Sequence, residues 1–259
     1  NFAAESHVDN SISGPGVFIQ TNINGTFSML HASLNYYKTL DENQQKQFRF
    51  LHVSTDEVFG SLQENDPPFN EQSRYQPNSP YSASKASSDH LVRAWQETYK
   101  LPTIITNCSN NFGPFQHREK LIPTIIRSCI QNKDIPIYGN GKNIRDWIFV
   151  GDHCDGIELA ISKGNTNETY LFGGEMELRN IDIAHKICEI LDVIKPKSSG
   201  ESYKSQIKFV QDRAGHDFRY AISNQKSFTE LGFKPSKTFD DRLKDCLLYT
   251  SPSPRDATL

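Results

Sequence analysis

The sequence lacks the features that mark several classes of protein. Among its 259 residues no apolar run approaches the length needed to cross a bilayer, so we expect no membrane partner. The net charge of −3 gives no sequence-wide excess of basic residues, which argues against a nucleic-acid partner or a polybasic membrane surface. The five cysteines are scattered and form no Cys-x-x-Cys pair, so we expect a reduced, cytoplasmic protein rather than a disulfide framework or a zinc site.

A glycine-rich turn of the G-x-G-x-x-G kind, which holds the pyrophosphate of a dinucleotide, is also missing. Gly14-Pro-Gly16 does not substitute for it, because no strand is predicted before it and proline occupies the turn. The first residue is not methionine and the chain starts in what resembles the end of a strand, so we expect a nucleotide-binding half upstream. Residues 249–259 lose helical periodicity and carry two prolines, so we expect a non-native or disordered tail there.

The rest of the sequence alternates apolar strands with longer helices. Apolar and β-branched runs at 48–54 and 103–108 predict buried strands, and Pro80 stands where a helix from 81 to 99 would begin. Parallel strands need crossover helices, so we expect an α/β fold with a doubly wound parallel sheet. Further helices are predicted at 17–37, 121–132, 155–162, 181–191, 223–231 and 239–248, and further strands at 135–138, 145–150, 169–172 and 207–210.

The character of the sequence changes after Gly113-Pro114. We therefore expect two domains. The larger would consist of residues 1–112 and 145–176, and a smaller, discontinuous one of residues 113–144 and 177–248.

Two adjacent carboxyl groups, Asp56 and Glu57, follow the predicted strand 48–54. At a strand end the chain can turn and present both side chains, and different environments could hold one as an acid and the other as a base. The alternative is that one of them caps the following helix, a common role for Asp. The residues alone leave both interpretations open.

Tyr81 and Lys85 lie four residues apart, on one face of the predicted helix 81–99. A lysine this close is expected to lower the pKa of the phenol, so that Tyr81 can accept a hydroxyl proton, with Thr55 adding a hydrogen bond. The pair alone would fit a helix surface equally well, but its position after the acidic strand end favours a functional role. Such a set suits oxidation of a sugar hydroxyl followed by loss of water.

Four cationic or titratable side chains of the second half, Lys120, Arg145, Arg213 and His216, fall in loops or at element ends. Arginine forks suit a pyrophosphate. The alternatives are a solvated charge for any one of them and a structural hydrogen bond for His216. No metal site is predicted.

Seven stretches of the chain together resemble one known family. They are Ala3-Ala-Glu-Ser-His-Val-Asp9, Val53-Ser-Thr-Asp-Glu-Val-Phe-Gly60, Pro80-Tyr-Ser-Ala-Ser-Lys-Ala-Ser-Ser-Asp-His-Leu91, Asn107-Cys-Ser-Asn-Asn-Phe-Gly-Pro114, Glu119-Lys-Leu-Ile-Pro123, Ile144-Arg-Asp-Trp147 and Arg213-Ala-Gly-His-Asp217. They resemble the extended short-chain dehydrogenase/reductases, and within them the dTDP-glucose 4,6-dehydratases. Thr-Asp-Glu is the discriminating motif, since epimerases of this fold differ there and GDP-mannose dehydratases resemble Thr-Ser-Glu.

The resemblance implies a Rossmann-like NAD-binding fold without its first strands, and a hydro-lyase acting on dTDP-glucose. Tyr81, with Lys85 and Thr55, would take the C4 hydroxyl proton while NAD takes the hydride. Glu57 would then remove the C5 proton, Asp56 would protonate the departing C6 hydroxyl, and the hydride would return to C6. By the same resemblance the cofactor would contact Phe2, Ala3, Ala4, Glu5, Ser6, Thr21, Tyr81, Lys85 and Asn111. The substrate would contact Ser6, Thr55, Asn110, Lys120, Leu121, Pro136, Ile137, Tyr138, Arg145, Asn180, Arg213, Ala214, Gly215, His216 and Asp217.

A homodimer, formed through helices 17–37 and 81–99, is a further expectation from the family. Because the glycine-rich turn is absent, we expect residues 1–259 alone to bind NAD poorly and to be inactive. Two alternatives remain: another nucleotide-sugar enzyme of this fold, such as a 4-epimerase or a dehydratase of a different nucleotide sugar, and a non-catalytic nucleotide-sugar or dinucleotide sensor.

Overall fold

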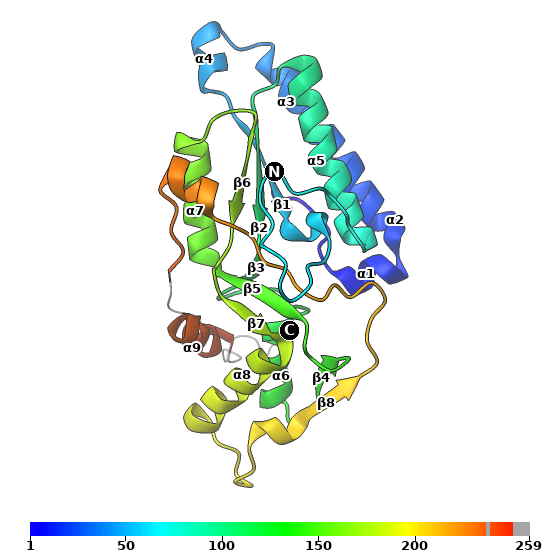
Figure 1. The fold of residues 1–259 in the computed structure, drawn as a ribbon, viewed down its shortest axis with the longest axis vertical. Coiled ribbons are helices and arrows are strands. Elements are labelled where there is room, and N and C mark those ends of the chain that lie inside the picture. Colours follow the sequence, from blue (N-terminus) through cyan, green and yellow to red (C-terminus); the bar gives the residue numbers. More distant parts are fainter. Residues whose placement is uncertain (237–238, 251–259) are drawn as a thin grey trace, which may run out of the picture.

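The centre of the fold is a three-stranded parallel sheet in the order β1-β2-β6 (Figure 1). The computed structural model describes residues 1–236 and 239–250. The strands are β1 (Phe50–Thr55), β2 (Thr103–Cys108) and β6 (Glu168–Phe172), and all six residues of β2 are buried. The prediction of a parallel α/β sheet is confirmed. It could be made from sequence because strands buried on both faces need continuous apolar runs, which the sequence supplies.

Helices cover both faces of this sheet. The helices α3 (Gly25–Tyr37) and α5 (Pro80–Tyr99) pack side by side on one face, and α7 (Val150–Lys163) packs on the other (Figure 1). Ser79 begins α5 as its N-cap, with Pro80 in the first turn, where its missing N–H costs nothing. This cap fixes where Tyr81 and Lys85 lie relative to the end of β1.

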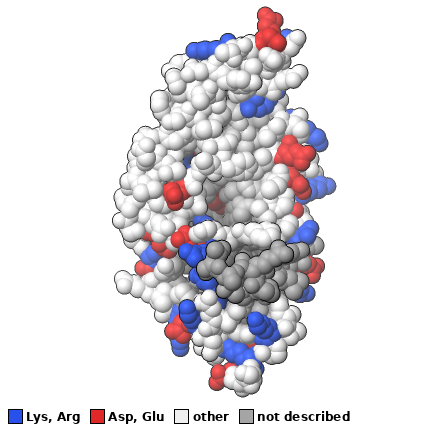
Figure 2. Space-filling model, turned by 180° about the vertical axis from the view of Figure 1, so that it is seen from behind, with Lys and Arg blue, Asp and Glu red and all other residues white. Residues whose placement is uncertain are grey.

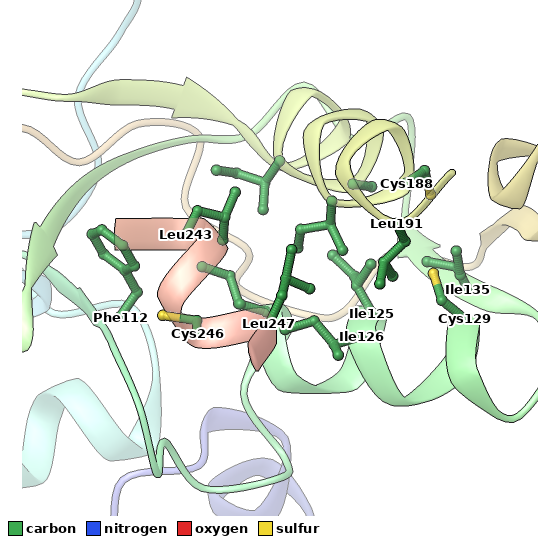
Figure 3. Close-up of a cluster of buried hydrophobic side chains, with 14 of the residues drawn as sticks. Phe112, Ile125, Ile126, Cys129, Ile135, Cys188, Leu191, Leu243, Cys246 and Leu247 are labelled. Atoms are coloured by element: carbon green, nitrogen blue, oxygen red, sulfur yellow. The ribbon is translucent and has the colours of Figure 1, made fainter. Parts of the chain in front are cut away.

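A second group of elements packs beyond the carboxyl ends of these strands. It contains the sheet β3-β5-β7 and the parallel pair β4-β8. Their core includes Ile125, Leu191 and Leu243, contributed by three helices that face one another in Figure 3. The elements are β3 (Asn110–Phe112), α6 (Leu121–Ile130), β4 (Ile135–Tyr138), β5 (Ile144–Phe149), β7 (Glu177–Arg179), α8 (Asn180–Ile194), β8 (Ile207–Val210) and α9 (Phe239–Thr250).

Two predicted helices differ from the structure. The helix predicted at 17–37 consists of α2 (Pro15–Phe18), the π-helix η1 (Ile19–Asn24) and α3, and the one at 223–231 shortens to the π-helix η4 (Ser227–Leu231). Tyr249 and Thr250 of the expected tail belong to α9, whereas 251–259 lie outside the described residues. The remaining elements are α1 (Val8–Ser13), α4 (Glu42–Gln47) and the 3-10 helices η2 (Asp56–Phe59) and η3 (Tyr203–Gln206).

No helix in residues 1–236 and 239–250 is long and apolar enough to cross a membrane. On the described part of the face in Figure 2, acidic and basic side chains are interspersed, and the surface is hollowed near its middle.

Candidate active site

The end of β1 carries the first group of candidate residues. Parallel pairing places Thr55 beside Cys108, so these two strands end at the same edge of the sheet. The Thr55 hydroxyl accepts a hydrogen bond from the Glu57 backbone N–H at 3.3 Å and caps η2. The capping role left open for the carboxyls is therefore taken by Thr55, and both Asp56 and Glu57 are available for chemistry.

Asp56 lies in surroundings that favour its neutral form. Its side chain is 2% exposed, and burial, followed by repulsion from Glu57, raises its pKa well above the ordinary value. One oxygen, Oδ1, accepts from the Thr55 hydroxyl at 3.3 Å, while Oδ2 has no hydrogen-bond partner within the described residues. A buried carboxylic acid with a free oxygen is suited to donate a proton.

Glu57 has a different environment, since its side chain lines a cavity of about 330 Å³. Burial raises the pKa of Glu57, but the positive charges of Arg213, Arg145 and Lys120 oppose that rise. The two neighbouring carboxyls thus meet the condition for separate acid and base roles.

Tyr81 and Lys85 are both buried at the start of α5, next to this strand end. Burial and then the charge of Glu57 raise the Tyr81 pKa well above its ordinary value, and the Thr55 hydroxyl opposes this rise only weakly. Lys85 Nζ donates to the Val53 carbonyl at 2.7 Å. The prediction that Lys85 lowers the Tyr81 pKa is wrong for this structure, because burial and Glu57 dominate and the ammonium is held on β1.

The cavity collects most of the predicted substrate residues from distant parts of the chain. Those that line it are Ser6, Asn110, Lys120, Leu121, Pro136, Ile137, Tyr138, Arg145, Asn180, Arg213 and His216. Thr55, Ala214, Gly215 and Asp217 lie outside this lining. Asp217 is buried and accepts from Asn78 Nδ2 at 2.6 Å and from the Tyr220 hydroxyl, so its side chain is engaged within the protein.

Arg145 is held rigidly where it borders the cavity. Its guanidinium donates to the carbonyls of Ile144 (2.7 Å), Asp217 (2.9 Å) and Phe218 (3.3 Å), and it stacks on the Tyr220 ring at 4.3 Å. Arg145, Lys120 and Arg213 bring positive charge to one cavity, which is the arrangement that a diphosphate needs.

Sequence reasoning missed acidic and polar residues around this cavity. Asp9 accepts from the Tyr138 hydroxyl at 3.2 Å and lies 3.7 Å from Arg213 Nη1, so it joins α1 to β4 and to the segment after β8. His7 and Glu119 also line the cavity. Asp9 is one of several polar residues in α1. The sequence alone does not show that its carboxyl group lies next to Arg213.

Five of the predicted cofactor residues form the start of the chain, at positions 2–6. Segment 2–6 is fixed by Asn22 of η1, which accepts from the Glu5 N–H at 2.8 Å and donates to the Glu5 carbonyl at 3.0 Å. Asn22 is 1% exposed and was not predicted. Its one signal in the sequence is an amide side chain within the helix predicted at 17–37. Of the other predicted residues, Phe2 is 69% exposed, Thr21 lies on η1, and Asn111 donates to Cys108 Sγ at 3.2 Å.

The donor set here fits a dinucleotide. Lys85 has three N–H donors, of which one serves Val53, and the others suit the hydroxyls of a ribose. The exposed ring of Phe2 offers an apolar surface for a nucleotide ring. A parallel sheet with a Tyr-x-x-x-Lys helix against its carboxyl edge is the arrangement of a short-chain dehydrogenase/reductase.

Comparison with known proteins narrows this class. A family model described as GDP-mannose 4,6 dehydratase matches residues 1–246. A dTDP-glucose 4,6-dehydratase of Xanthomonas campestris is 53% identical over 240 residues, covering 93% of this chain and 68% of that protein. One from Escherichia coli is 51% identical over 252 residues, covering 94% of this chain and 69% of that protein.

A solved structure agrees with these relatives. DesIV, a dTDP-glucose 4,6-dehydratase from Streptomyces venezuelae with NAD and TYD bound, superimposes with a TM-score of 0.85 at 40% identity, covering 96% of this chain and 71% of that chain. The chain therefore belongs to the GDP-mannose 4,6 dehydratase family, and within it to the dTDP-glucose 4,6-dehydratases.

Proposed function

We infer that the protein is an NAD-dependent dTDP-glucose 4,6-dehydratase, which converts dTDP-glucose to dTDP-4-keto-6-deoxyglucose. The observation that carries this inference is the strand end Thr55-Asp56-Glu57, where a buried carboxyl group with a raised pKa stands beside a second carboxyl group that lines the cavity. Sequence identities of 51% and 53% to proteins of this name support it. The chemistry requires an acid and a base close to one sugar: Glu57 lines the cavity, and Asp56 is the next residue to it in the chain, buried behind the lining.

Tyr81 is assigned the proton of the C4 hydroxyl. Its surroundings keep the phenol neutral, so this role requires positive charge nearby when substrate is bound. Bound NAD supplies a hydride acceptor at C4, a hydride donor at C6 and a positively charged ring. Lys85 adds its ammonium, and Thr55 is assigned a hydrogen bond to the phenol hydroxyl.

Glu57 and Asp56 are assigned the loss of water. Oxidation at C4 makes the C5 proton acidic, and the Glu57 carboxylate takes that proton. Asp56 gives its proton to the C6 hydroxyl, which leaves as water, and a C5–C6 double bond forms. When C6 is reduced, Glu57 returns its proton to C5. Asp56 is reprotonated from solvent, to which Tyr81 releases the proton of the C4 hydroxyl. The arginines and Lys120 would bind the diphosphate, which holds the sugar against these two carboxyls.

The residues that would hold NAD are Phe2 to Ser6, Thr21, Tyr81, Lys85 and Asn111. Residues 1–259 carry no glycine-rich turn for the pyrophosphate, so we propose that this stretch alone binds NAD weakly and turns over poorly. Calorimetric titration of NAD into residues 1–259 and into the full-length protein tests this directly. Equal affinity would contradict it.

We also propose two domains, of residues 1–112 with 145–176, and of 113–144 with 177–248. The separate cores support this division: Ile125, Leu191 and Leu243 belong to one cluster, and Ile104 and Tyr170 to another. Ligand would then bind between the two, where the cavity collects residues of both.

A homodimer is proposed through the helical side of the molecule. Val17, Phe27, Met29 and Tyr36, on α2 and α3, expose apolar side chains, each between 46% and 59% accessible. A second copy of this face would cover them. Sedimentation equilibrium should show a dimer that Val17→Glu with Met29→Glu converts to a monomer. A cytoplasmic location is proposed as well, since Cys108, Cys129, Cys154 and Cys188 are free thiols and three of these four are buried.

Product analysis of the full-length protein with dTDP-glucose and NAD tests the function. We expect a 4-keto-6-deoxy sugar, with one water lost by mass spectrometry. A C4 epimer of unchanged mass would establish the epimerase alternative, and turnover of GDP-mannose in preference to dTDP-glucose would establish a different dehydratase. Binding of dTDP-glucose without formation of any product would establish the non-catalytic sensor alternative.

A further inference from the structure

A buried carboxylate that the proposed chemistry does not use lies one helical turn beyond Lys85. Asp89 of α5 is 2% exposed. Its Oδ2 accepts from the Ser54 hydroxyl at 2.8 Å and from the Tyr75 hydroxyl at 2.9 Å. Its Oδ1 lies 3.3 Å from Nε2 of His52. Two hydroxyl groups thus donate to one oxygen of this carboxyl group.

Asp89 and Lys85 hold adjacent residues of β1. Lys85 donates to the Val53 carbonyl at 2.7 Å, and Asp89 accepts from Ser54, the next residue. Residues four apart on a helix lie on the same face, so the two charges are neighbours. The strand segment that they hold leads directly into Thr55.

We propose that Asp89 is a positioning residue of this site: its carboxylate is the counter-charge that keeps Lys85 a buried ammonium, and through Ser54 it fixes the end of β1 against the start of α5. The inference rests on the proposed function, because that function gives Lys85 its role beside Tyr81. It adds a residue that neither lines the cavity nor belongs to the proposed cofactor contacts.

The groups that face Lys85 from other elements support this role. Burial lowers the Lys85 pKa, and the charge of Asp89 is the largest influence that raises it. His52 of β1 and the amino group of Asn1 also face Lys85, and its charge lowers the pKa of each. Burial raises the pKa of the Cys108 thiol of β2 to about 11, so this thiol is uncharged at neutral pH. Among these groups Asp89 supplies the negative charge.

The test is a direct titration of Lys85 by NMR in the full-length protein, with Lys85→Met used to assign its signal. Asp89→Asn removes the charge and keeps the shape. Ser54→Ala and Tyr75→Phe each remove one hydrogen bond to Asp89 and keep its charge, so they are the matched controls. We expect Asp89→Asn to move the Lys85 titration to lower pH by about one pH unit, and the two controls to leave it in place.

An unchanged Lys85 titration in Asp89→Asn would overturn the proposal, as would an equal displacement in all three variants. If Asp89→Asn does not fold, Asp89→Glu serves instead: it keeps the charge and must titrate like the wild type, and a displacement to lower pH contradicts the proposal. Because the titration needs no turnover, its failure is distinguishable from failure of the dehydratase function, which product analysis tests.

Discussion

Replacing Asp56 with Asn should change the free energy of unfolding relative to the wild type, and this difference should shift in favour of the variant as the pH rises. Asp56 is 2% exposed, and burial raises its pKa well above the ordinary value. In the unfolded chain the carboxyl loses its proton near pH ~4, whereas the folded protein retains it. The unfolded state therefore binds fewer protons above that pH, and the wild type loses stability as the pH increases.

The size of the effect follows from the linkage. Each pH unit between the unfolded and folded pKa costs the wild type about 1.4 kcal/mol, and Asp56→Asn is spared this cost. Between pH ~5 and ~7 the advantage of the variant should grow by up to about 3 kcal/mol. The assay is urea unfolding, followed by circular dichroism, at several pH values in this range.

The matched control is Glu64→Gln, because Glu64 is an exposed carboxyl in the loop after η2. Its unfolding free energy should follow the wild type at every pH. Any constant effect of the new amide cancels, since only the change with pH is compared. A difference between Asp56→Asn and wild type that stays constant from pH ~5 to ~7 would refute the assignment of Asp56 as a buried neutral acid.

Three further predictions concern catalysis, binding and packing. Glu57→Gln and Tyr81→Phe should each lower kcat by about 10²- to 10⁴-fold without lowering Tm, and an unchanged initial rate would remove them from the mechanism. Arg213→Gln should raise KM by about tenfold or more, and an unaltered KM would mean that Arg213 does not bind substrate. Leu243→Ala, at a fully buried position of α9, should cost about 2–5 kcal/mol of unfolding free energy. The control Val193→Ala, 80% exposed, should stay within about 0.5 kcal/mol, and equal losses would contradict the packing described.

Local sequence patterns predicted most of the fold. The buried strand at 103–108 matches β2, and the helix at 81–99 matches α5 within one residue, because strong apolar runs and a proline at a helix start act locally. The π-helix η1 was not foreseen. Its buried Asn22 bonds to Ser84 of α5, a contact 62 residues distant in sequence, and such a tertiary contact leaves no local pattern.

The site was predicted less completely, for a related reason. Motif resemblance located Glu57 and the arginines, and the structure brings them to one cavity. It did not give the electrostatic balance at Tyr81, which depends on how deeply the phenol is buried and on the nearby charge of Glu57. Asp9 and Asp89 were missed because their partners lie on other elements.

The central claim is that one active site oxidises C4, removes water and reduces C6 of the same sugar. Turnover of dTDP-glucose carrying deuterium at C4, by the full-length protein with NAD, tests this most directly. The account predicts a 4-keto-6-deoxy product in which the deuterium is found at C6. Deuterium that remains at C4 of an epimer, or that is released to solvent, would contradict it.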